Sequence, residues 1–153
     1  MQSRRDTSEN YLYVGDAYSQ SQDFVRAIRA YKRALELNPE PELEMLLCWN
    51  CALAIWFRAG FVNREDTNTT DSEYEEVLAA RALYRRMLTI YETNFGGRSE
   101  SSELPVGELY QYAKDNLVDS RRYCLVSQLP DGTFIPRVID PDWFNLGDWF
   151  QKQ

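Results

Sequence analysis

Apolar side chains recur every three or four residues in five stretches of the chain, a spacing that places them on one face of a helix. The first two predicted helices begin with capping aspartates, Asp6 for a helix that runs to Ser19 and Asp23 for the next. A third helix begins at Pro41, whose ring suits the first helical position, and Gly60 ends it. The turns between these helices are short, which predicts antiparallel neighbours.

A longer polar loop, residues 60–71, precedes the fourth predicted helix, which is capped by Asp71 or Ser72 and ends near Asn94. A stretch rich in Gly and Ser then separates this helix from a fifth one, over about residues 105–125. Four helices in two antiparallel hairpins, followed by a fifth helix, predict an all-α fold.

The C-terminal segment, residues 126–153, has a different character. Residues 125–129 and 133–135 flank a Pro-Asp-Gly turn and predict a small hairpin. The triplet Asp-Trp-Phe then occurs twice, and its large rings are Trp143, Phe144, Trp149 and Phe150. Because exposing such rings to water is costly, we expect them to pack against their own domain, a second protomer or another protein. The tail packs on its own domain as a cap, joins two protomers in a homodimer, or serves as a linear motif for another protein.

The composition excludes several kinds of catalysis. The chain has 153 residues, a net charge of −7 and no histidine, which removes Ser-His-Asp and Cys-His catalysis and His-based metal sites. Cys48 and Cys51 have the spacing of a redox or zinc pair, but no further pair completes a four-ligand site, and both fall inside a predicted helix. We therefore predict buried thiols, no metal site, no cofactor and no enzymatic activity.

Charge and hydropathy also bear on partners and location. No large segment carries a net positive charge, which disfavours nucleic acid as a partner. Arg81 and Arg85, on the fourth predicted helix, are expected to face solvent. The N-terminus lacks the apolar core of a signal peptide. The longest apolar stretch, Leu43 to Phe57, is interrupted by polar residues and is too short to span a bilayer. We therefore expect a soluble, cytoplasmic protein without a membrane segment.

The first predicted hairpin carries a regular set of residues, Tyr11, Val14, Gly15, Tyr18, Ala27, Tyr31, Ala34 and Pro39. Residues 8–41 thereby resemble a tetratricopeptide repeat, whose pattern is W-x2-L-G-x2-Y, then A-x3-F, then P. The small residues Gly15 and Ala27 stand where the two helices of such a hairpin approach most closely. This resemblance implies that the first hairpin is a complete repeat.

Residues 42–95 resemble a second repeat more loosely. Ala52 and Tyr84 fit the pattern, but the loop is longer and Glu92 replaces the closing proline. The helix over about residues 105–125 is similar to the extra helix that commonly covers the open end of such arrays. The resemblance thus implies a helical domain over residues 1–125, with residues 126–153 as an extension that packs on the domain or on a partner.

In this family, the first helix of each hairpin lines a concave groove that binds extended peptides or partner helices. The residues that the resemblance places in the groove are Leu12, Asp16, Trp49, Asn50, Leu53, Trp56 and Phe57. Asn50 matches the position where many members hydrogen-bond a peptide backbone. Leu12 and Asp16 replace the Lys and Asn with which one subclass clamps the C-terminal carboxylate of heat-shock chaperones. The implied ligand is therefore apolar or weakly basic.

Two interpretations of the aromatic residues stay open. Trp49, Trp56 and Phe57 line the groove, or they pack as core beneath the fifth helix. The function implied by the resemblance is a non-catalytic protein–protein interaction module, acting as an adaptor or assembly factor. The alternative is a structural or homo-oligomeric subunit whose aromatic tail makes the contact.

Overall fold

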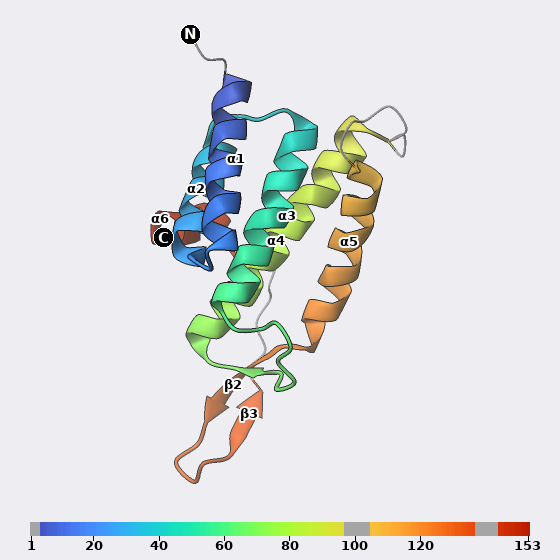
Figure 1. The fold of residues 1–153 in the computed structure, drawn as a ribbon. Helices are drawn as coiled ribbons and strands as arrows, with labels where there is room; N and C mark the ends of the chain where they lie inside the picture. Colours follow the sequence, from blue (N-terminus) through green and yellow to red (C-terminus); the bar gives the residue numbers. More distant parts are fainter. Residues whose placement is uncertain (1–3, 97–104, 137–143) are drawn as a thin grey trace.

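The computed structural model describes residues 4–96, 105–136 and 144–153. It confirms the all-α fold and adds a small sheet (Figure 1). The elements are α1 (Arg4–Gln20), α2 (Phe24–Glu36), α3 (Pro41–Arg58), β1 (Asn68–Thr69), α4 (Asp71–Asn94), α5 (Val106–Asp119), a 3-10 turn η1 (Ser120–Arg122), β2 (Cys124–Gln128), β3 (Phe134–Pro136) and α6 (Leu146–Gln151). Within the described ranges, no helix combines the length and the apolar character needed to cross a bilayer.

Helices α1 and α2 form one antiparallel hairpin, α3 and α4 form a second, and α5 lies beside α4 (Figure 1). The first hairpin closes tightly because Gly15 of α1 has no side chain where the ring of Tyr31 of α2 lies against it. Tyr31 is only 1% exposed. A continuous apolar core runs from α1 through α5 and includes two rings of α6.

Local sequence signals predicted some helix boundaries correctly. The Asp23 side chain accepts a hydrogen bond from the backbone N–H of Arg26, and Pro41 is the first residue of α3. The predicted starts of α1 and α4 are wrong. Helix α1 continues back to Arg4, so that Asp6 lies inside it. Thr70 caps α4 through a reciprocal capping box with Glu73, in place of Asp71 or Ser72.

Helix α5 is shorter than predicted because the chain after it pairs with another segment. The backbone N–H of Cys124 donates to the carbonyl of Thr67 at 2.8 Å, and β2 runs parallel to β1. The predicted hairpin is present as the antiparallel pair β2–β3. The long loop after α3 thus supplies strand β1, which pairs with the chain that follows α5, and α5 ends at Asp119. No local sequence signal indicates this pairing.

A second, smaller core lies where this loop meets the end of α3. The rings of Trp56, Phe61 and Tyr123 pack together, with centroids of Trp56 and Phe61 4.7 Å apart. Phe61 is 1% exposed, although it was predicted as part of a polar loop.

The predicted solvent-facing position of Arg81 is also wrong. This side chain is 8% exposed and donates to the carbonyl of Leu117 at 2.7 Å and to the hydroxyl of Ser120 at 2.5 Å. Arg81 therefore holds the C-terminal end of α5 against α4, where it satisfies a backbone carbonyl that the helix leaves unpaired.

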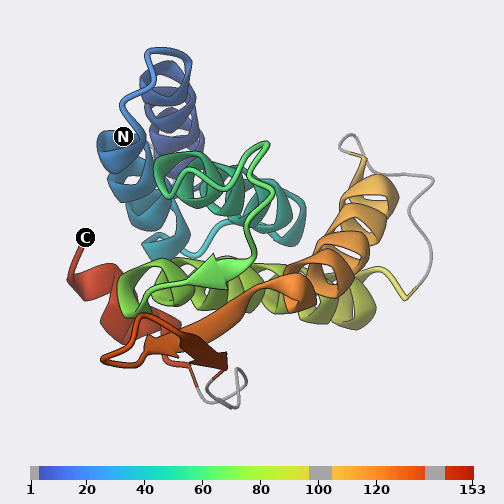
Figure 2. The ribbon, with the colours of Figure 1, turned by 90° about the horizontal axis from the view of Figure 1, so that it is seen from below.

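The C-terminal tail packs on its own chain. Helix α6 and the hairpin β2–β3 lie on one side of α4, and α3 lies on the other (Figure 2). Trp149 and Phe150 are buried, and Phe144 is half-buried against the same core. Arg58 holds the end of the tail, because its guanidinium donates to the Gln153 side chain at 2.7 Å and lies over the Trp149 ring. Trp143 lies outside the described residues.

The three cysteines differ in exposure, which predicts their reactivity. Burial raises the pKa of the Cys48 thiol to about 12 and raises that of Cys51 further above its ordinary range, while Cys124 is exposed. Because the thiolate is the reactive form, we expect Ellman's reagent to modify one thiol of the native protein quickly and all three after denaturation. A Cys124→Ser variant should lose the fast phase, whereas a fast phase that persists in this variant would contradict the buried placement.

Candidate binding groove

A groove of about 210 Å³ lies between α1, α2 and α3. Helix α1 contributes its C-terminal end, α2 contributes Phe24 and Tyr31, and α3 contributes its second half. Its lining residues are Asp16, Ser19, Gln20, Phe24, Tyr31, Asn50, Leu53, Ala54 and Phe57.

The polar part of the groove is organised around Asp16. One carboxylate oxygen of Asp16 accepts hydrogen bonds from the hydroxyl of Tyr31 at 2.6 Å and from the amide nitrogen of Asn50 at 3.1 Å. The hydroxyl of Ser19 lies 3.2 Å from that of Tyr31. Burial, and then the hydrogen bond to Asp16, raise the pKa of Tyr31 above its ordinary range, so that it stays a neutral donor. The network joins all three helices and fixes the orientation of the Asn50 amide.

The apolar part of the groove is open to solvent. Leu53 is 40% exposed and Phe57 is 42% exposed, although both belong to a helix that is otherwise largely buried. The ring of Phe57 stacks on that of Phe24, with centroids 5.3 Å apart and planes inclined by 10°. The groove therefore presents a fixed carboxylate and amide beside exposed apolar side chains.

Residues 8–41 match the family model of the tetratricopeptide repeat. These are the residues that the sequence pattern indicated. This segment is therefore similar to a tetratricopeptide repeat, a unit that in general serves protein–protein interaction and is typically non-catalytic. No curated protein and no solved structure matches the chain.

The first hairpin of the groove, α1 and α2, is the matched repeat, and α3 follows directly after it. Of the residues that the resemblance placed in the groove, Asp16, Asn50, Leu53 and Phe57 line it together. Leu12 is 6% exposed and belongs to the main core. Asp16 and Asn50 come from two different hairpins, so their hydrogen bond joins the repeat to the next helix.

The two tryptophans of α3 lie elsewhere. Trp49 packs against Tyr84 and Tyr112, with its ring centroid 5.6 Å from that of Tyr112, and Trp56 packs against Phe61 and Tyr123. Both are half-buried against the core. Trp49 lies beside α5, as one of the two interpretations of these residues expects, whereas Trp56 belongs with the smaller core around Phe61. Trp49 and Trp56 are seven residues apart and lie on the same side of α3. Asn50 and Phe57, each one residue further along, lie together on the neighbouring side of the helix.

Sequence reasoning missed Phe24 as a groove residue. Its apolar character and its place at the start of α2 were visible, but its stacking on Phe57 depends on how α2 and α3 are placed relative to each other. The repeat pattern indicates how Tyr31 packs on Gly15 within the first hairpin, but not how α2 lies against α3.

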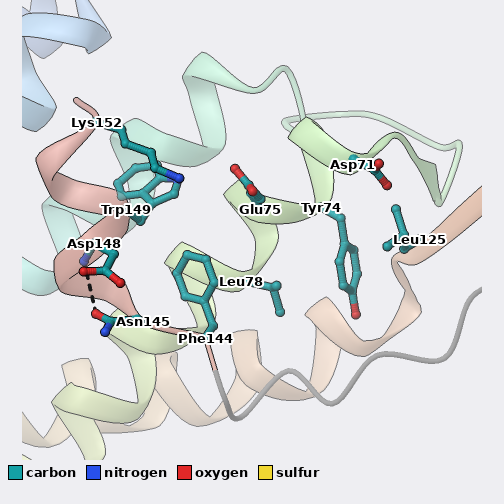
Figure 3. A pocket seen from close by; sticks show the side chains of 10 residues that line it. All are labelled: Asp71, Tyr74, Glu75, Leu78, Leu125, Phe144, Asn145, Asp148, Trp149 and Lys152. Carbon is teal, nitrogen blue, oxygen red and sulfur yellow. Dashed lines mark hydrogen bonds between the residues drawn. The ribbon is translucent and has the colours of Figure 1, made fainter.

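A second cavity, of about 350 Å³, lies between α4, α6 and β2 (Figure 3). No residue lines both this cavity and the groove. Its apolar walls include the rings of Tyr74, Phe144 and Trp149, and Glu75 and Asp148 stand at its edge. The described side chains include no group of three or more acidic residues or cysteines arranged to hold a metal ion.

Proposed function

We propose that this protein is an interaction module that binds a peptide or a partner helix in the groove between α1, α2 and α3. The observation that carries this proposal is the exposure of Leu53 and Phe57 beside the hydrogen-bonded pair Asp16–Asn50. Exposed apolar side chains next to preorganised polar groups are typical of a recognition surface. The match of residues 8–41 to a tetratricopeptide repeat supports the same function.

The groove suits a ligand with apolar side chains and a free backbone amide or a basic group. The hydrogen bond from Asn50 to Asp16 fixes the amide before a ligand arrives, which lowers the entropic cost of binding. Asp16 contributes a negative charge, which favours a neutral or basic ligand over an acidic one.

In the cell, the module would act as an adaptor or assembly factor of the cytoplasm, without catalysis of its own. The alternative function, a homo-oligomer joined by the aromatic tail, receives less support. Trp149 and Phe150 are buried against their own chain, so that they would have to leave this packing before they could join two protomers.

A selection of peptides displayed on phage against the full chain supplies probes for the groove. Affinities of the selected peptides, measured by isothermal titration calorimetry, should fall at least tenfold in Leu53→Glu and in Asn50→Ala. Leu53→Glu places a carboxylate among apolar contacts, and Asn50→Ala removes a fixed hydrogen-bonding group.

Val118→Glu is the matched control, because Val118 is 61% exposed on α5, and it should leave the affinities unchanged. Circular dichroism should show that all three variants keep the helical content of the unmodified protein. Peptides that bind Leu53→Glu and the unmodified protein equally would contradict the proposal.

A further inference from the structure

The cavity between α4, α6 and β2 has an aromatic and apolar interior. Trp149 and Phe144 form the wall on the α6 side, Tyr74 and Leu78 belong to α4, and Leu125 of β2 closes the other end (Figure 3). Its volume of about 350 Å³ is at the lower end of the range for ligand pockets, a size suited to one large side chain and its immediate neighbours.

The edge of this cavity is acidic. Glu75 projects from α4 and Asp148 from α6, and both are exposed (Figure 3). In the described part of the chain, neither carboxylate lies within 4.0 Å of a basic group, and Lys152, the one cation of the lining, pairs with neither. Glu76, next to Glu75, is by contrast already paired with Arg58 at 2.8 Å. Among the residues that the structure describes, the charge left without an ion pair at the cavity is therefore negative.

One wall of the cavity already binds a guanidinium group. Arg58 of α3 lies over the ring of Trp149, with its central carbon 5.4 Å from the ring centroid. A guanidinium is planar and weakly hydrated, and it stacks on aromatic rings while its N–H groups reach carboxylates. The aromatic interior and acidic edge of the cavity offer the same two kinds of contact to a second guanidinium.

We propose that this cavity binds an arginine side chain of a partner polypeptide, flanked by apolar residues. The aliphatic stem and the guanidinium plane pack against Trp149, Phe144 and Tyr74, and the N–H groups reach Glu75 and Asp148. This site is separate from the groove, and its occupant enters on the other side of α4 from α3. The protein would thus contact a partner at two places.

The test uses two acetylated and amidated pentapeptides, Gly-Leu-Arg-Leu-Gly and its analogue with citrulline in place of arginine. Citrulline has nearly the same shape without the charge. Binding to the full chain is followed through the indole N–H signal of Trp149 in ¹⁵N–¹H correlation spectra, which a Trp149→Phe variant assigns. The arginine peptide should shift this signal saturably, and the citrulline peptide should bind at least fivefold more weakly.

Variants of exposed residues test the charges. Glu75→Gln and Asp148→Asn should each weaken binding of the arginine peptide about threefold to tenfold, and Lys152→Gln should strengthen it. Glu65→Gln, at an exposed acidic residue outside the cavity, should change nothing, and Leu53→Glu in the groove should leave the Trp149 shift intact. Equal binding of the two peptides, or shifts centred on the Asn50 amide in place of Trp149, would overturn the proposal.

Discussion

Replacing Trp149 by alanine is expected to lower the free energy of unfolding by about 3–5 kcal/mol, the usual cost of removing a buried tryptophan. Trp149 is 4% exposed and belongs to the same apolar core as α1 to α5. Its ring packs against Phe150, with centroids 5.5 Å apart, and carries the guanidinium of Arg58. The variant would lose all of these contacts and would widen an existing cavity.

Urea unfolding followed by circular dichroism measures this loss. Lys152→Ala is the matched control, since it lies at the end of the same helix with its side chain exposed, and it should change the free energy of unfolding by less than about 0.5 kcal/mol. If Trp149→Ala behaved like the control, the tail would not be part of the cooperative fold. A contact with another molecule would then become the better explanation of its aromatic residues.

The positions of the hairpin helices could be predicted because caps and breakers act over a few residues. Asp23 and Pro41 begin their helices as expected, and the spacing around Gly15 and Tyr31 indicated the matched repeat. The wrong start of α4 has the same local origin. Thr70, Asp71 and Ser72 are all good caps, and the reciprocal bond between Thr70 and Glu73 decides among them.

Features that depend on distant pairing could not be predicted. Strand β1 consists of two residues and forms only because Cys124 and Leu125 pair with it. Helix α6 has six residues, too few for a periodic pattern, and its packing on α4 stabilises it. Phe61 likewise becomes buried only where this pairing brings Tyr123 against the end of α3.

The groove was partly predictable for a related reason. The repeat pattern located Asp16 and Asn50 on the inner helices of two hairpins, and they meet as expected of such helices. It could not tell which of the neighbours Trp49 and Asn50 lines the groove, because residues that are adjacent in sequence point only about 100° apart on a helix. The direction of Trp49 follows from the position of Tyr112 on α5, which lies outside both hairpins.

Gly15→Ala is expected to lower the free energy of unfolding by about 1–3 kcal/mol, although alanine favours helix over glycine by about 1 kcal/mol. A Cβ atom at this position would lie 2.4 Å, 2.7 Å and 2.9 Å from three ring carbons of Tyr31, far inside contact distance. The ring cannot move aside cheaply, because it is buried and its hydroxyl donates to Asp16. The overpacking therefore outweighs the helix propensity.

A double-mutant cycle with Tyr31→Leu separates the two effects. In the Tyr31→Leu background the obstructing ring is absent, so Gly15→Ala should become neutral or stabilising, and the two substitutions should be strongly non-additive in urea unfolding. An equal cost of Gly15→Ala in both backgrounds would show that Tyr31 is not the cause. Because Tyr31 also positions Asp16, the single variant Gly15→Ala should in addition weaken the peptides selected for the groove, which would link the close packing of the repeat directly to binding.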